Sequence, residues 1–409
     1  MKKKKIIFIS PPGFFIKRKQ GQNDQNPDHD HFYFGRRGLG HFIASNFKKV
    51  FNDIEIEIWR IDSNVDDLKS RVIKEGILSK VYPLKGNKKY NYSINFINDL
   101  KKEAIFNEVI IWFDGLHNFF FMVVSLLFKK QYQIVHRLGG DNFTYKFEKT
   151  GKLKYKIFDF IEKQLFNRNI NFGILAIERE YENFTNYDTK LLKSHVAGID
   201  TKRWKLIDQK TAREKLGLPL NEKIVLQSGR ANSNKGTHIA IKLWKNFLER
   251  ENIKLYLTGV TEYDELYDEV KSSGCNFTGT IDHEILPYWM AAADIYLYIP
   301  DDEITLNFAA IGYSPLEALA TGTPIVCTIK NDIEFMGIKI EEYSDVIKTP
   351  VSIENAADMV IGLLDKKPNP KRCNEFIQNH LSDEVVFNNI ISELSKDNNI
   401  FFSSLTRHN

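Results

Sequence analysis

The sequence predicts an α/β protein with two doubly wound parallel sheets, on three observations. Short β-rich runs alternate with helical runs along most of the 409 residues. The alternation breaks near residue 200 and then restarts, and the length exceeds that of one ordinary core. Such alternation covers a parallel sheet with helices on both faces. We therefore expect domains at 1–197 and 198–380 that face each other across a cleft, and a last segment, 381–409, whose helix packs back on the first domain.

Apolar runs that end at turn residues predict the strands of the first domain. We expect these strands at 5–10, 54–61, 109–113, 134–136 and 172–177. Glycines at 35–40 precede a helix over 41–51. The most apolar run, 119–128, is about half as long as a membrane span and predicts a buried helix.

The second half of the chain repeats the pattern with shorter connections. We expect strands at 223–227, 253–258, 275–278, 295–299 and 324–328. Between and after them we expect helices at 237–250, 264–272, 284–293, 314–320 and 383–394.

Charge and cysteine content exclude several classes of protein. A formal charge of +4 on 409 residues argues against a nucleic-acid coat. Residues 1–200 hold 34 basic and 23 acidic residues, and the remainder hold 23 and 30. The basic half either steers an anionic acceptor or attracts an acidic membrane surface, or its lysines are simply solvated. Three cysteines without metal-ligand spacing indicate a reducing compartment. No secretory signal is apparent, so we expect a cytoplasmic chain, peripheral to the inner face of the plasma membrane if lipid attracts it.

The segment 229–236, with sequence GRANSNKG, lies where a strand ends and a helix begins. Open α/β sheets bind ligands at this position. Glycines permit a close backbone approach, a helix start offers free amides, and Arg230 and Lys235 add two cations. The segment suits a diphosphate, although a plain turn with surface cations gives the same pattern.

A second segment, 312–324, places Glu317 early in a helix that follows another loop. The pattern of Ser314 followed three residues later by Glu317 also matches a capping box, which would make the carboxylate structural. The functional interpretation is that Glu317 accepts hydrogen bonds from a ribose diol.

Four motifs in this order resemble glycosyltransferase family 4. They are the 229–236 segment, FTGTI at 277–281, AAADIYL at 291–297 and LEALATGTPIV at 316–326. VAGID at 196–200 also resembles the family's signature before its interdomain linker. The resemblance implies the GT-B fold, with an acceptor-binding and a donor-binding Rossmann-like domain. It implies a retaining enzyme that needs no metal and no cofactor. Its donor is a nucleoside diphosphate sugar, most often of UDP or GDP.

Site residues follow from the resemblance by position. It implies that Arg230 and Lys235, the catalytic pair, grip the donor diphosphate and that Glu317 holds the ribose. Backbone at 279–281 lies against the base, and glycines of the first loop approach the phosphates. The implied nucleotide-binding set is Gly38, Gly40, Gly229, Arg230, Lys235, Gly279, Thr280, Ile281, Gly312, Ser314 and Glu317.

One position departs from the family pattern. The family carries a Glu eight positions before the ribose Glu, and this chain has Ala309 there. Either an upstream residue (Glu303, Asp302 or Asn307) replaces it, or the donor sugar is unusual, or activity is lost. Further sugar or acceptor contacts are expected from loops that follow two first-domain strands: His117, Arg137 and Asp141.

The sequence thus predicts a hexosyltransferase-like enzyme of bacterial surface-polysaccharide synthesis. Its expected partners are a nucleotide sugar and a glycan or lipid-linked acceptor, with a peripheral contact to anionic membrane and no nucleic acid. One alternative is a non-catalytic sugar-nucleotide-binding partner of another transferase, motivated by Ala309. Another is an epimerase or phosphorylase that shares the GT-B architecture.

Overall fold

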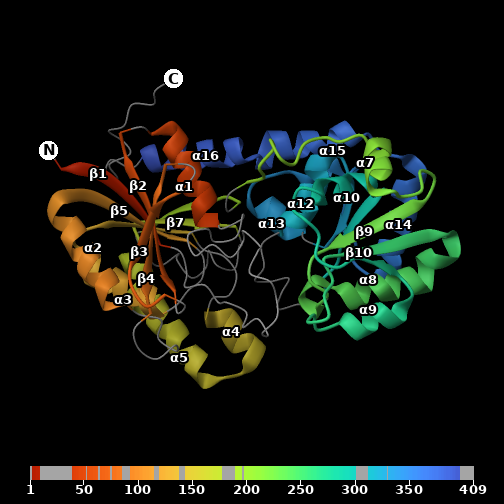
Figure 1. The fold of residues 1–409 in the computed structure, drawn as a ribbon. Helices are drawn as coiled ribbons and strands as arrows, with labels where there is room; N and C mark the ends of the chain where they lie inside the picture. Colours follow the sequence, from red (N-terminus) through yellow and green to blue (C-terminus); the bar gives the residue numbers. More distant parts are fainter. Residues whose placement is uncertain are drawn as a thin grey trace. The chain divides into compact units, whose positions relative to one another are not determined.

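The chain forms two compact units in a computed structural model. Unit 1 comprises Met1–Ala197 and Phe387–Asn409, and unit 2 comprises Gly198–Val386. Figure 1 shows a sheet covered by helices in each of them. The structure describes residues 2–9, 39–51, 53–62, 65–73, 76–84, 93–114, 119–137, 143–176, 189–195, 198–300, 312–328 and 330–396.

Unit 1 is built on an eight-stranded sheet of order β3-β4-β2-β1-β5-β6-β7-β8. Strand β3 runs antiparallel to β4, and the other neighbouring strands are parallel. The strands are β1 (Lys3–Ile9), β2 (Glu55–Asp62), β3 (Lys69–Val72), β4 (Leu78–Pro83), β5 (Asn107–Asp114), β6 (Gln133–Arg137), β7 (Phe172–Leu175) and β8 (Lys190–Lys193). The helices are α1 (Leu39–Val50), α2 (Ile94–Phe106), α3 (Phe119–Phe128), α4 (Phe143–Thr150) and α5 (Leu153–Ile161).

Short irregular turns complete unit 1. After α5 come a π-turn, Glu162–Phe166, and a 3-10 turn, Asn167–Asn169. The apolar run at 119–128 is helix α3, as expected, and most of its side chains are buried. Within the described part of the chain, no helix has both the length and the apolar character required to cross a membrane.

Unit 2 is built on a six-stranded parallel sheet of order β11-β10-β9-β12-β13-β14. Its strands are β9 (Lys223–Ser228), β10 (Ile253–Thr258), β11 (Asn276–Phe277), β12 (Ile295–Tyr298), β13 (Ile325–Cys327) and β14 (Ile347–Lys348). The order reverses between β9 and β12, and in unit 1 it reverses between β1 and β5. Both sheets are therefore doubly wound, and a ligand is expected at the carboxyl ends of the strands beside each reversal.

Helices cover both faces of the second sheet (Figure 1). Alternate residues of β9, β10, β12 and β13 pack with α8 and α14 in one core. The helices are α7 (Gln209–Leu216), α8 (Thr237–Leu243), α9 (Tyr267–Ser273), α10 (Leu286–Ala292), α12 (Tyr313–Thr321), α13 (Lys330–Phe335), α14 (Ile353–Lys366), α15 (Pro370–Phe376) and α16 (Asp383–Ser395). The helix expected over 237–250 continues past α8 as a π-turn, Trp244–Leu248, and a 3-10 turn, Glu249–Glu251. Two further 3-10 turns and one further π-turn are Ser233–Lys235, Ile340–Tyr343 and Ile377–Leu381.

Two distant segments meet where the chain enters and leaves unit 2. Ile199 forms an isolated parallel bridge with Ser382, and the Asp383 amide donates to the Ile199 carbonyl at 2.9 Å. Gly198 has a φ of +70°, and a Cβ there would lie 2.7 Å from the Asp383 Cα. The close approach therefore requires glycine at 198.

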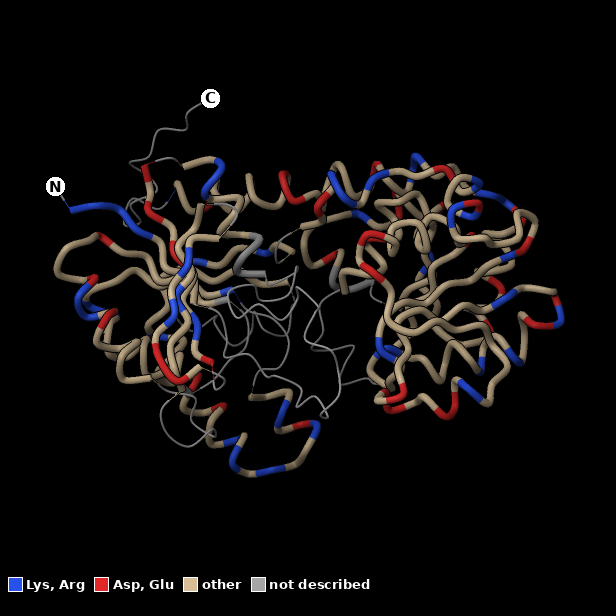
Figure 2. Tube along the Cα trace, in the orientation of Figure 1, with Lys and Arg blue, Asp and Glu red and all other residues tan. Residues whose placement is uncertain are grey.

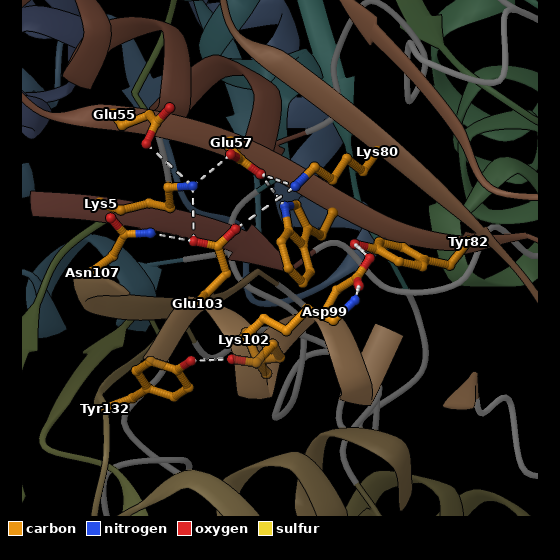
Figure 3. A network of polar contacts seen from close by, with 12 residues as sticks. Lys5, Glu55, Glu57, Lys80, Tyr82, Asp99, Lys102, Glu103, Asn107 and Tyr132 are labelled. Carbon is orange, nitrogen blue, oxygen red and sulfur yellow. Dashed lines mark hydrogen bonds and ion pairs between the residues drawn. The ribbon is translucent and has the colours of Figure 1, made fainter. Parts of the chain in front are cut away.

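A charge network crosses the amino ends of the unit 1 strands (Figure 3). The Lys5 Nζ lies 2.7 Å from Glu57 and 2.9 Å from Glu103, and Lys80 lies 2.9 Å from Glu57. Burial alone would raise the pKa of Glu57, but hydrogen bonds from Lys5 and Trp59 and the charge of Lys80 lower it. The network joins β1, β2, β4 and α2 at the edge opposite the carboxyl ends.

Candidate functional site

The loop after β9, residues 229–236, has free space beside its first glycine. Gly229 has a φ of +125°, which disfavours other residues, and its amide donates to the Thr258 carbonyl of β10 at 2.8 Å. A Cβ at Gly229 would have no atom within 4 Å, so there is free space beside this backbone. The residue lies at the carboxyl end of the sheet, beside the reversal of strand order.

The other end of the loop is pressed against the neighbouring strand. Gly236 has a φ of +67°, and a Cβ there would lie 1.8 Å from the carbonyl oxygen of Ile299, directly after β12. Side chains do not tolerate such a contact with backbone. Gly236 therefore lets the start of α8 approach the end of β12.

Side chains other than those of Arg230 and Lys235 hold the loop in place. The Asn232 side chain accepts from the Lys235 amide at 3.0 Å, and Gln227 donates to the Lys235 carbonyl at 2.9 Å. Asp264 accepts from the amides of Ala231, at 3.2 Å, and Thr261, at 2.9 Å. The loop is thus fixed by contacts from β9 and from the segment before α9.

The expectation of free amides at this helix start is wrong for three residues. The Gly236 amide donates to the Ser233 carbonyl at 2.8 Å, and that of Thr237 to the Asn232 carbonyl at 3.4 Å. The Lys235 amide is bonded to Asn232 as well. These amides satisfy the tight 3-10 turn, so side-chain cations are the main anion-binding groups that this loop offers.

Lys235 is a half-buried cation close to a second cation. Burial and the charge of Arg230 lower the pKa of Lys235, while the charge of Glu317 raises it. The Lys235 Nζ lies 5.2 Å from the centre of the Tyr298 ring. Arg230 itself is exposed, and neither cation forms an ion pair with another described residue. Two adjacent cations with this surplus of positive charge favour an anionic ligand.

Helix α12 brings a carboxylate to the same place. It begins at Tyr313, with Gly312 as its N-cap and no side-chain cap bond, so the capping-box interpretation of Ser314 and Glu317 is wrong. Glu317 is only 2% exposed. A Cβ on Gly312 would lie 3.7 Å from the Lys235 Nζ, so the positive end of α12 is beside the lysine.

Tyr296 connects the two halves of this site. It is fully buried in β12, and its hydroxyl lies 3.2 Å from the Ser228 amide and 3.3 Å from the Ser228 carbonyl. It also bonds the side chain of Ser314. Burial, above all, raises the pKa of Tyr296, so it stays neutral. One hydroxyl therefore ties the end of β9 to the first turn of α12.

Glycines follow three neighbouring strands at this edge. The Gly259 amide, after β10, donates to the Gly279 carbonyl, after β11, at 3.2 Å. A Cβ on Gly259, whose φ is +85°, would lie 3.5 Å from the Gly229 carbonyl oxygen. Gly279 and Thr280 are exposed, and Ile281 is half-buried. The structure thus brings Gly229 and Gly279 to one edge and adds Gly259.

The other predicted residues lie either outside the described part of the chain or in unit 1. Gly38, His117, Asp141, Asp302, Glu303, Asn307 and Ala309 lie outside the described residues. Gly40 was expected in a loop, but it is the second residue of α1. Arg137 is the last residue of β6, opposite Asp114 of β5, and is 5% exposed. It lies at the carboxyl edge of the unit 1 sheet.

Several residues of the site were missed by the sequence analysis. Tyr296 and Asp264 act through contacts with residues 68 and 33 positions away, which no local pattern reveals, and Gln227 contacts Lys235 eight residues later. Gly259 did carry a signal in the sequence. The dipeptides Ser228-Gly229, Thr258-Gly259 and Thr278-Gly279 lie at the ends of three successive strands of unit 2. A glycine repeated at this position predicts a shared backbone surface.

The second half of the chain matches a known family. Residues 208–380, nearly all of unit 2, match the family model described as glycosyl transferases group 1. The match agrees with the resemblance drawn from the motifs.

Three comparisons with individual proteins agree with this match. The chain is 26% identical over 183 residues to the lipopolysaccharide core biosynthesis mannosyltransferase LpsB of Rhizobium meliloti; the match covers 42% of this chain and spans half of LpsB. Sucrose-phosphate synthase from Thermosynechococcus elongatus has a TM-score of 0.69 at 16% identity, over 98% of this chain and 100% of that one. HepE of Anabaena in complex with UDP has a TM-score of 0.65 at 13% identity, over 96% and 100%. The fold is GT-B, as expected.

Proposed function

We propose that this protein is a retaining glycosyltransferase. It transfers a sugar from a nucleoside diphosphate sugar to a hydroxyl of a glycan or lipid-linked acceptor. The main observation is Lys235 at the carboxyl edge of the unit 2 sheet, beside the start of α12, where the charges of Arg230 and Glu317 both act on it. The family match of residues 208–380 supports the same function.

The chemical barrier is charge separation as the diphosphate leaves the sugar. Arg230 and Lys235 would stabilise that anion from fixed positions, and the positive end of α12 would add to their effect. Removing one such group typically lowers the rate about 10²- to 10³-fold. Glu317 would accept hydrogen bonds from the ribose, while exposed backbone at Gly279 and Thr280 would lie against the base.

We also propose that the reaction needs neither a metal ion nor a cofactor. The cations of the site supply the charge that a divalent metal would otherwise supply to a leaving diphosphate. The donor nucleotide would be UDP or GDP; the complex of HepE with UDP supports the former.

Two observations support the proposed acceptor: the name of a relative and the charge of the chain. The name of LpsB supports a role in surface-polysaccharide synthesis. The excess of basic residues before residue 200 supports an anionic or membrane-bound acceptor. We place the enzyme in the cytoplasm, at the inner face of the plasma membrane.

A donor panel tests the proposal. Purified protein is melted with UDP-, GDP-, ADP- and CMP-sugars, and the stabilising donor is incubated with candidate sugar acceptors. We expect one nucleotide to stabilise the protein and NMR of the product to show a retained anomeric configuration. EDTA should leave turnover intact. Arg230→Ala should lose the stabilisation, whereas Arg250→Ala, an exposed arginine of the same unit, should keep it.

A second function, non-catalytic sugar-nucleotide binding, is motivated by Ala309. It predicts the same stabilisation by a nucleotide sugar, but neither transfer nor slow donor hydrolysis. Turnover by the purified wild type that disappears in Arg230→Ala excludes it. Failure of all four nucleotide classes to bind contradicts both functions.

A further inference from the structure

Helix α5 of unit 1 exposes a stripe of large apolar side chains. Leu153 is 67% exposed, Ile157 is 52% exposed and Phe160 is 64% exposed. Their spacing of four and three residues places them on one face of the helix. A contiguous exposed apolar face usually marks an interaction surface.

The opposite face of α5 is fixed to its neighbour, so the stripe points away from the fold. The Phe158 ring lies 5.3 Å from the ring of buried Phe143 of α4. Asp159 accepts a hydrogen bond from Thr144 and pairs with Lys163 at 3.0 Å. These contacts orient the helix and leave the apolar side outermost.

Lysines flank the stripe. Residues 143–163 hold six lysines and three acidic residues. Three of these lysines, Lys152, Lys154 and Lys156, are exposed and pair with no acidic residue in the described part of the chain. By helical position, Lys154 and Lys156 lie on either side of the apolar stripe. Figure 2 shows this basic cluster along α4 and α5.

From this arrangement we propose that α5 docks on a lipid bilayer that carries anionic headgroups. The apolar stripe inserts at the boundary of headgroups and acyl chains, and the flanking lysines contact the anionic headgroups. A helix with large apolar side chains on one face and lysines beside them has this binding mode. The binding strength of such a helix depends on its buried apolar area and on its attraction to anionic lipids, and α5 supplies both.

The proposal rests on the membrane location given under Proposed function and names the surface that docks there, while docking itself depends on no residue of the nucleotide site. It also gives the basic residues of the first half a definite place. A second copy of this chain is a poorer occupant, because two lysine-flanked stripes would bring like charges together.

Vesicle flotation of the full chain tests the proposal. We expect binding to vesicles of 30% phosphatidylglycerol in phosphatidylcholine, and at least tenfold weaker binding to pure phosphatidylcholine or in 0.5 M salt. The combined change Leu153→Ser, Ile157→Ser and Phe160→Ser should weaken binding about tenfold or more. Lys152→Gln, Lys154→Gln and Lys156→Gln together should weaken it about fivefold per lysine.

Matched controls make the test specific. Helix α2 exposes Ile94, Ile105 and Phe106 to a similar degree, and their change to serine should leave binding unchanged. Lys202→Gln, Lys205→Gln and Lys271→Gln together, all at exposed positions in unit 2, should do the same. Thermal melting of each variant confirms that it folds.

Three results would overturn the proposal. Equal binding to neutral and anionic vesicles removes the role of the lysines. Loss of binding in the α2 variant rather than the α5 variant places the surface elsewhere. A dimer of the wild type in light scattering, converted to monomer by the α5 serine changes, identifies the stripe as a self-association surface.

Discussion

The ammonium of Lys235 is held in surroundings that disfavour a charge. Burial and Arg230 lower its pKa, and Glu317 only partly offsets them. A bound diphosphate would supply the missing negative charge. The charged residue therefore lowers the stability of the folded protein, as functional groups commonly do, and affinity for an anion is the gain that we propose.

Lys235→Met should separate these two effects. We expect a higher melting temperature without ligand, because the disfavoured charge is gone, and loss of stabilisation by UDP. The pKa of Lys235 is lower in the folded chain than in the unfolded one. The advantage of the methionine variant is therefore present at neutral pH and fades as pH rises through that pKa. Lys242→Met, an exposed change in the following helix α8, should leave the melting temperature unaltered both without ligand and with UDP.

Glu317→Ala should weaken the binding of nucleosides and of sugar nucleotides alike. A hydrogen bond to a charged group contributes about 1.5–3 kcal/mol, so the loss should be about tenfold or more. Calorimetry with uridine and with UDP measures it. Weakening of the sugar nucleotide only, with unchanged affinity for uridine, would contradict the ribose role.

Single residues were predictable where a motif is local. Arg230, Lys235 and Glu317 were selected from short segments, and the structure brings Lys235 beside Gly312, where the charges of Arg230 and Glu317 both act on it. Tyr296 was not predictable as a link, because its partners are 68 residues before it and 18 residues after it in the chain. Apolar and tyrosine-rich strand patterns predict that a residue is buried. They do not predict the hydrogen-bond partner of its hydroxyl.

At the scale of elements, Tyr296→Phe tests the link between β9 and α12. We expect affinity for UDP to fall about fivefold to tenfold, because both elements lose a shared hydrogen-bond partner. Ser314→Ala should have a similar but smaller effect. Tyr256→Phe removes a hydroxyl bonded to Glu222 at 2.9 Å, away from the site, and should leave the affinity unchanged. Equal losses in both tyrosine variants would indicate a general loss of stability instead.

The charge network of unit 1 should make β1, β2, β4 and α2 sensitive to acid. Glu57→Gln should lower the free energy of unfolding by about 3 kcal/mol at neutral pH, because Lys5 and Lys80 lose a buried partner. The pKa of Glu57 is lowered by folding, so its stabilisation is present above about pH 4.3 and disappears as pH falls through the folded value. The difference between variant and wild type in urea titrations should shrink accordingly. Glu55→Gln, at a half-exposed partner of Lys5, should cost about 1 kcal/mol or less.

Element boundaries were predictable in the strands of the core and less so in helices. The strand over 253–258 begins and ends where expected, because polar residues and a glycine bound an apolar run. The expected helix over 237–250 changes to a π-turn at Trp244, whose indole donates to the Ile253 carbonyl at 2.8 Å. A tertiary contact of this kind overrides helical periodicity, so the sequence alone could not locate the change.

At the scale of the whole molecule, the last helix belongs to both units. Helix α16 begins in unit 2 and continues in unit 1, where Phe387 packs 5.0 Å from Phe47 of α1. Leu394→Ala, at a fully buried position, should lower the stability of unit 1 by about 3 kcal/mol. Calorimetric affinity for UDP should be retained, since the residues that we propose to bind the nucleotide lie in unit 2. Asn388→Ala, at an exposed position of the same helix, should change neither quantity.

The overall fold was more predictable than the site. Alternation of strands and helices implied two doubly wound sheets, and the structure has both, with reversals beside β1 and β9. The sequence did not indicate β3, whose exposed residues lack an apolar pattern because it is an antiparallel edge strand. Local sequence patterns indicate which residues are buried. An edge strand buries too few side chains to produce such a pattern.

The pairing of Ile199 with Ser382 has a consequence for recombination between relatives. The chain passes into unit 2 at 197–198 and out of it at 386–387. The Ile199–Ser382 bridge lies close to both passages in the sequence, and Gly198 packs against Asp383. A hybrid that exchanges residues 198–386 as one block therefore carries both partners of the bridge with it, and its second splice point falls within α16. Glycine at 198 has to be retained, because a side chain there would collide with the backbone of Asp383.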